Sequence, residues 1–160
     1  PKPDGEIQIE QEALLREIAL WNYVNREAIH NIRPWKIIRE GNFWFTADKT
    51  GNTVYAIVPA GKEWPYGSRK EFLFKTLEGS NDTRVTILGY KSELLEYREG
   101  FDSKIYIQPG KMGLLVSAVN GHRLYTNNQW PNPVVFRIQN VKYRPAEEFQ
   151  GKSSTLDGAK

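Results

Sequence analysis

The chain of 160 residues contains no cysteine, which excludes a disulfide framework, a thiolate metal site and a cysteine nucleophile. Histidine is almost as scarce, because His30 and His122 are the only two and they do not form a metal-ligand spacing such as His-x-x-x-His. Neither a metal ion nor a cofactor is therefore expected. No nucleophile elbow is present, and Glu96, Glu99 and Asp102 are typical of a solvated edge rather than a catalytic pair. A self-contained enzyme has little support.

Long hydrophobic runs and blocks of like charge are absent too. The longest uncharged apolar stretch, MGLLVSAV, is far shorter than the roughly 18 residues that a membrane-spanning helix needs, so no membrane segment is predicted. The formal net charge of +3 comes from 22 basic and 19 acidic residues that are dispersed along the chain, which argues against a nucleic-acid partner. A start on PKPDG indicates a chain that was processed or is a piece of something longer.

The residues that are present divide into three regions. The first, residues 1–35, begins with a loop, and a helix is predicted from Asp4 to about Trp35. The apolar residues recur at steps of three and four, which places them on one face of a helix. Pro34 is expected to end this helix, because proline disfavours helical geometry at the residue before it and donates no hydrogen bond. The apolar stripe consists of Leu14, Leu15, Ile18, Trp21, Val24 and Ala28.

The second region, residues 36–143, carries alternating or β-branched runs separated by turn compositions such as DKTGN. This spacing predicts a mainly β fold, an antiparallel β-sandwich in which FWFTA and TVYAIV are neighbours joined by the DKTGN turn. The third region, residues 144–160, is polar and is predicted to be a tail. The eight expected strands are KIIRE, FWFTA, TVYAIV, EFLFKT, TRVTILGY, KIYIQ, GLLVSAV and VVFRIQNV.

A helix with an apolar stripe needs a surface that covers it, and an antiparallel sandwich normally closes its core with its own inner faces. The stripe is therefore expected to pack on another domain. Four sequence motifs indicate what this other domain is. PKPDGEI, LLREIALWNYVNREAIHNIRPW, VYAIVPAGKEWP and TRVTILGY resemble the C-terminal part of α-L-fucosidases of glycoside hydrolase family 29. The matching positions of the helix are Trp21, Asn25, Glu27, Ala28, Ile29, Arg33, Pro34 and Trp35.

The resemblance implies a retaining exo-α-L-fucosidase that removes terminal α-L-fucose from glycans. In that family two carboxylates of a (β/α)8-type barrel perform the reaction, and the resemblance places them upstream of Pro1. This chain would supply only the last outer helix of the barrel and the sandwich that braces it, so it holds no catalytic residue and is expected to be inactive alone. The implied partners are the catalytic barrel and fucosylated glycans, and a homo-oligomer stays open. The implied compartment is secreted, periplasmic or lysosomal.

Two residues of the first loop, Lys2 and Asp4, are candidate substrate contacts, because loops that follow barrel strands form the catalytic face of such a barrel. This loop, from Pro1 to Gly5, is the only part of the chain expected near the pocket. The alternative stays open that Asp4 and Gly5 only make the turn into the helix.

Aromatic residues in turn-like stretches are a second candidate site. Trp64 and Tyr66 lie in KEWPYGS, and Tyr125 and Trp130 lie in RLYTNNQWPNP. Their rings could stack on the apolar face of a sugar, so Trp64 and Trp130 are candidate substrate-binding residues. In the alternative, the Trp-Pro pairs plug the end of the sandwich or a domain interface. Aromatic residues within strand runs, such as Trp44, are expected in the core.

A second function therefore stays open beside the fucosidase. The chain could be a stand-alone carbohydrate-binding or interaction sandwich without catalysis. The helix separates the two hypotheses, because a self-sufficient binding module has no need of part of a barrel.

Overall fold

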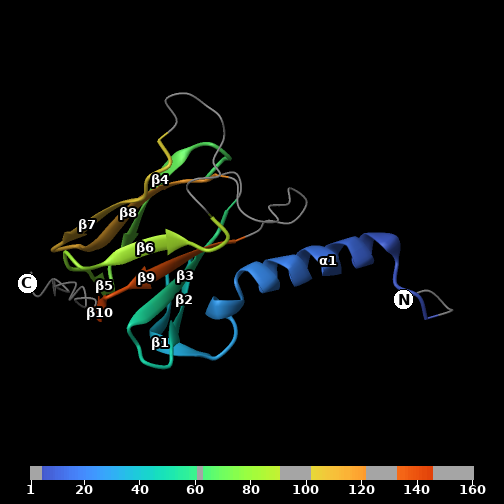
Figure 1. The fold of residues 1–160 in the computed structure, drawn as a ribbon, viewed down its shortest axis with the longest axis horizontal. Coiled ribbons are helices and arrows are strands. Elements are labelled where there is room, and N and C mark those ends of the chain that lie inside the picture. The colour runs from blue at the N-terminus through green and yellow to red at the C-terminus, as the bar shows by residue number, and fades with distance from the viewer. Residues whose placement is uncertain (1–4, 61–62, 91–101, 122–132, 146–160) are drawn as a thin grey trace, which may run out of the picture.

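The computed structural model describes residues 5–60, 63–90, 102–121 and 133–145 (Figure 1). The helical part consists of one α-helix, α1 (Ile9–Val24), and a single 3-10 turn, η1 (Arg26–Ala28). The rest of the described chain is mainly β. The strands are β1 (Ile32–Glu40), β2 (Phe43–Asp48), β3 (Thr53–Val58), β4 (Arg69–Phe74), β5 (Leu77–Glu78), β6 (Arg84–Ile87), β7 (Tyr106–Gly110), β8 (Gly113–Val119), β9 (Val134–Gln139) and β10 (Lys142–Tyr143).

Helix α1 ends ten residues before Pro34, so the prediction that this proline terminates it is wrong. The side chain of Asn25 donates from Nδ2 to the carbonyl oxygen of Trp21 at 2.9 Å, and its backbone N–H donates to the same oxygen at 3.0 Å. The backbone bond is the last regular bond of the helix, and the side chain competes for the same oxygen at the position where the helix ends. Pro34 instead lies inside β1, an edge strand of its sheet, where a residue without an N–H is tolerated.

The strands form two main sheets, both antiparallel. One has five strands in the order β1-β2-β3-β9-β6, and the other has three in the order β4-β8-β7. Each of the eight predicted strand runs overlaps one of these strands, and the short pair β5 and β10 was not predicted. The two sheets enclose one core, which is the arrangement of a β-sandwich (Figure 1).

The core between the sheets is rich in aromatic rings. Phe136 of β9 contacts Phe72 and Phe74 of β4, with ring centroids 5.2 Å and 6.1 Å apart and steep interplanar angles. Phe45 of β2 joins the same cluster against Phe74. Such edge-to-face pairs are the favoured geometry for aromatic side chains. Because the rings come from both sheets, they hold the layers of the sandwich together.

The predicted hairpin of β2 and β3 is confirmed, and Asp48 organises its turn. The carboxylate accepts hydrogen bonds from the Gly51 N–H at 2.6 Å, the Thr53 N–H at 3.3 Å and the Thr50 hydroxyl at 2.8 Å. Burial tends to raise the pKa of Asp48, but these hydrogen bonds outweigh it and leave the pKa below its usual value. Gly51, at φ +82°, supplies the left-handed residue of the turn.

Candidate functional site

The predicted loop site at the start of the chain cannot be compared with the structure. Lys2 and Asp4, its two candidate substrate contacts, lie outside the described residues, and so does the aromatic candidate Trp130. Pro1 lies outside them as well. The placement of the catalytic carboxylates upstream of Pro1 therefore stays a prediction.

The remaining predicted substrate contact, Trp64, does not present an exposed ring. It is 1% exposed, packs against Phe72 at 4.8 Å between centroids and donates from Nε1 to the carbonyl oxygen of Ser68 at 3.0 Å. The expectation of a surface ring is therefore wrong for Trp64, and the packing alternative describes it. Although Pro65 follows Trp64 directly, the Trp64 ring lies in the core between the two sheets.

For Trp44 the prediction of a core position is wrong. The strand run placed it in the core, yet its side chain is 48% exposed, while its neighbour Phe45 is buried. Strand residues alternate between faces, so only one of two adjacent aromatics can point inward. The guanidinium of Arg39 lies over the Trp44 ring, 5.2 Å from its centroid. A hollow of about 370 Å³ opens beside this pair, lined also by Asn42, Pro59, Ala60 and Glu63.

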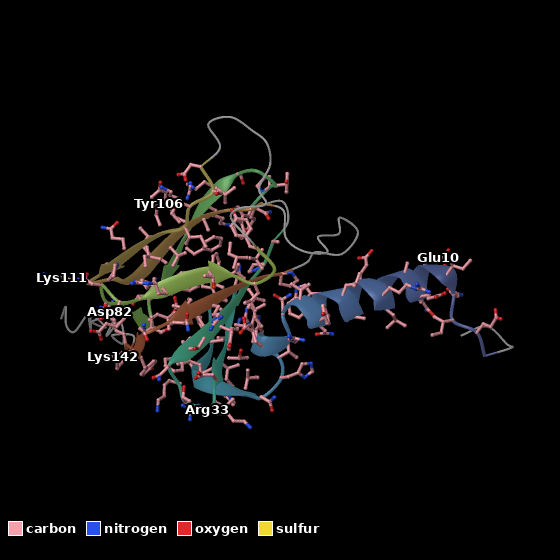
Figure 2. All side chains as sticks on the ribbon, in the orientation of Figure 1. Glu10, Arg33, Asp82, Tyr106, Lys111 and Lys142 are labelled. Carbon is pink, nitrogen blue, oxygen red and sulfur yellow. The ribbon has the colours of Figure 1, made fainter. Side chains whose placement is uncertain are left out.

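Asp102 was expected to be an ordinary solvated carboxylate, but it takes part in a fixed surface cluster. Its Oδ2 accepts from the Tyr106 hydroxyl at 2.8 Å and from Arg69 Nη2 at 3.2 Å. The Arg69 guanidinium also lies 5.0 Å from the centre of the Tyr106 ring. The backbone N–H of Lys104 and the Tyr106 hydroxyl hold the pKa of Asp102 below its usual value, and this bond raises the pKa of Tyr106. Tyr106, labelled in Figure 2, is the first residue of β7, so the cluster braces this end of the strand.

A second polar group lies on the face of the five-stranded sheet that points away from the core. Arg137 and Glu27 form a long ion pair there, at 3.9 Å, and Tyr55 lies opposite Arg137 in the ladder between β3 and β9. Burial raises the pKa of Tyr55, and the negative charge of Glu27 adds to this effect. The Thr46 hydroxyl donates to the Ala28 carbonyl oxygen at 3.0 Å. These contacts fix η1 on the sheet.

No group of three or more His, Asp or Glu side chains within the described ranges is arranged to hold a metal ion. Among the same residues, no helix is long and apolar enough to cross a membrane.

Helix α1 is attached to the sandwich at its C-terminal end. The Trp21 indole donates from Nε1 to the carbonyl oxygen of Pro133 at 2.8 Å and packs beside Tyr55 and Val135 on the outer sheet face. The outer end, marked by Glu10 in Figure 2, projects away from the sheets without another described element beside it. Trp21, which the stripe assigned to another domain, thus contacts this chain. It acts as the anchor of the helix.

The projecting part of α1 is unusually apolar for a surface helix. Leu14 and Leu15 are 45% and 51% exposed, and Leu20 and Tyr23 are also exposed. At about 100° per residue these side chains point to several sides of the helix rather than to one stripe. Exposed large apolar side chains that gather in this way often mark a surface that other protein covers. In the same helix Glu17 is buried, and its Oε2 makes no hydrogen bond within the described part of the chain.

No family model matches the chain, but curated proteins do. An α-L-fucosidase of Branchiostoma floridae is 33% identical over 97 residues, which make up 59% of this chain and 20% of that protein. The plasma α-L-fucosidase of Rattus norvegicus is 32% identical over 93 residues, or 56% of this chain and 19% of that protein. The tissue α-L-fucosidase of Bos taurus is 36% identical over 119 residues, which make up 72% of this chain and 22% of that protein.

The chain therefore spans about a fifth of the length of the curated relatives that it matches. The similarity confirms the predicted resemblance to part of an α-L-fucosidase.

Proposed function

We propose that this chain is the C-terminal, non-catalytic region of a retaining exo-α-L-fucosidase of glycoside hydrolase family 29. In this proposal α1 is the last outer helix of a (β/α)8-type barrel, and the sandwich braces that barrel from one side. The full protein would hydrolyse terminal α-L-fucose from glycans. The names of the rat and bovine relatives, a plasma and a tissue enzyme, support a secreted or lysosomal compartment for it.

The observation that carries the proposal is the exposed apolar surface of α1. Leu14, Leu15 and Leu20 would each contribute roughly 1.5 to 3 kcal/mol if a partner enclosed them fully, whereas in this chain they face solvent. A catalytic barrel would supply the apolar surface that encloses these side chains.

The proposal places the chemistry outside this chain, on a barrel upstream of Pro1. Retaining glycosidases use two carboxyl groups about 5 to 5.5 Å apart, one as nucleophile and one as acid and base. Several described carboxylates serve other roles, namely the Asp48 turn, the Asp102 cluster and the Glu27 ion pair with Arg137. The sandwich would then act on catalysis only through the stability of the barrel.

The test compares the 160-residue chain with a longer protein that carries it. The isolated chain is expected to show no hydrolysis of an aryl α-L-fucoside, and to aggregate or lose helical signal because α1 is exposed. Leu15→Ser should improve its solubility but weaken the longer protein. Met112→Ser, which changes an exposed apolar residue of the sandwich, is the matched control and should do neither.

Two results would overturn the proposal. Hydrolysis by the isolated chain would place the catalytic carboxylates within it. A soluble monomer with a fully formed α1, measured by sedimentation and circular dichroism, would show that the helix needs no partner.

A further inference from the structure

We propose that the hollow beside Trp44 is a binding site for one pyranose ring of a neutral glycan. It is formed by Arg39, Asn42, Trp44, Pro59, Ala60 and Glu63, and is called the Trp44 hollow below. This site lies on the sandwich and involves binding without bond cleavage. It does not depend on whether the chain belongs to a fucosidase.

The local sequence builds the hollow through a tight hairpin. Glu40 of β1 pairs with Phe43 of β2, so that only Gly41 and Asn42 form the connection. Gly41 has φ +58°, a left-handed value that two-residue hairpins require. The turn projects Asn42 to the rim of the hollow, where its amide offers both a donor and an acceptor.

An irregularity in β1 sets the aromatic floor. The register between β1 and β2 shifts between Pro34 and Arg39, after which Arg39 lies opposite Trp44. Opposite residues in a ladder share a face, and the guanidinium lies over the indole, 5.2 Å from the ring centroid. Arg39 is held in this position by a hydrogen bond from its Nε to the Gly41 carbonyl oxygen at 2.6 Å. Arg39 therefore covers one face of the Trp44 ring, and a ligand would use the other face.

The opposite wall is anchored to the core. Pro59 and Ala60 follow the end of β3, and Glu63 directly precedes the buried Trp64. Asn120 Nδ2 donates to the Trp64 carbonyl oxygen at 2.7 Å, and this bond adds to the packing of the indole. Sites whose supporting residues are fixed in this way lose little conformational entropy on binding.

The composition of the hollow fits a neutral polyol with an apolar face. A half-exposed indole can pack against the C–H face of a pyranose ring, while Arg39, Asn42 and Glu63 offer donors and acceptors for hydroxyl groups. Arg39 and the ion pair between Glu63 and Lys70, 3.5 Å apart, place charges of both signs at the walls, which favours a neutral ligand over an ion. The volume of about 370 Å³ lies at the lower end of the range for ligand pockets, roughly 300 to 1,000 Å³.

The experiment measures binding to the 160-residue chain with the Leu15→Ser substitution, which is expected to keep it soluble and lies on α1, away from the hollow. Methyl glycosides of L-fucose, D-galactose, D-mannose and N-acetyl-D-glucosamine are titrated into the protein, with saturation-transfer NMR and tryptophan fluorescence as readouts. At least one pyranoside is expected to bind, and galactitol, an open-chain polyol without a ring, is expected not to. Trp44→Ala should weaken binding by about tenfold or more, and Trp44→Phe should weaken it less.

Matched controls separate the site from other exposed aromatics. Tyr23→Ala removes a ring that is 62% exposed on α1, and it should leave the affinity unchanged. Asn42→Ala should weaken binding without changing the thermal unfolding midpoint, because Asn42 is an exposed turn residue. Equal binding with and without Trp44→Ala, or no binding of any pyranoside, would overturn the proposal. Protection of Trp44 from solvent in a longer protein would also overturn it, because the ring would then be a protein contact.

Discussion

The sandwich and helix α1 use apolar residues in opposite ways. In the sandwich, aromatic side chains such as Phe45, Phe74 and Phe136 are almost completely buried between two sheets. In α1, large apolar side chains face solvent, and the helix contacts the sandwich mainly through Trp21. The sandwich therefore has its own core, whereas the helix depends on something beyond itself.

This contrast has a physical basis. A β-sandwich closes an apolar interior with two inner faces, but a single helix cannot bury any face alone. Isolated helices shorter than about 12 to 15 residues are marginal in water even when they are rich in alanine, and α1, with 16 residues, is only slightly longer and is not alanine-rich. Its formation thus depends on packing at Trp21 and on the surfaces that enclose the rest. Mutations in the two regions should have very different effects on stability.

The largest effect is expected for Phe136→Ala in the sandwich. Phe136 is fully buried and contacts Trp64 and, across the sandwich, Phe72 and Phe74, so its removal should lower the free energy of unfolding by about 3 to 5 kcal/mol. Urea denaturation followed by the sheet signal measures this change. A loss below about 1 kcal/mol would contradict the view that the sandwich depends on its own core.

The next effect concerns a polar link across the sandwich. The Glu40 carboxylate, at the end of β1, accepts from the Lys75 N–H at 2.8 Å, the Thr76 N–H at 2.9 Å and the Thr76 hydroxyl at 2.6 Å. Because Thr76 is buried, Glu40→Ala leaves unsatisfied donors and should cost about 1 to 3 kcal/mol. Glu40→Gln keeps an acceptor oxygen and should cost less. Equal losses for both variants would contradict the hydrogen-bond explanation.

Trp21→Ala tests the connection between the two regions. Removing the indole deletes its bond to Pro133 and its packing on the outer sheet face, so α1 should fray while the sheets stay folded. Hydrogen exchange should rise in α1 and remain unchanged in β3 and β9. Faster exchange in those strands as well would mean that the helix and the sandwich form one cooperative unit.

Much of the sandwich could be predicted because its strands carry strong local signals. The apolar, β-branched run TVYAIV and the turn residues of DKTGN predicted both the strands and their pairing, which β2 and β3 confirm. The short strands β5 and β10 were not predicted, because a strand of two residues is too short to show a periodic pattern. The predicted end of α1 was wrong, since the Asn25 side chain competes for the Trp21 carbonyl oxygen well before Pro34.

The two tryptophans show what local pattern cannot decide. Trp64 follows a turn and precedes a proline, yet tertiary packing turns it into the core. Trp44 lies in a strand, and only the register between strands decides which of Trp44 and Phe45 points inward. Long-range pairing was not visible in one sequence, so the exposed ring of the Trp44 hollow could not be found from it.

A smaller effect is expected for Leu14→Ser in the exposed part of α1. The side chain contributes little to this chain on its own, so the free energy of unfolding should change by less than about 0.5 kcal/mol. The same substitution should weaken the longer protein measurably if α1 is enclosed there. Sedimentation of the isolated variant should also reveal less self-association. An equally large loss of stability in both contexts would contradict the assignment of Leu14 to a partner surface.

The smallest expected effect is a pH dependence that belongs to the sandwich and not to α1. Hydrogen bonds from Thr50, Gly51 and Thr53 hold the pKa of Asp48 below the usual value of 3.8 in the folded state. The stabilisation that the Asp48 carboxylate contributes is therefore fully present above the pKa that this group has in the unfolded chain. It is lost as the pH falls through the pKa that the group has in the folded chain. Asp48→Asn should remove this component, so wild type and variant should converge in stability as the pH drops below about 3.8. NMR titration of the Asp48 carboxyl measures the cause directly, and a midpoint at or above the usual value would show that the turn does not stabilise the charge.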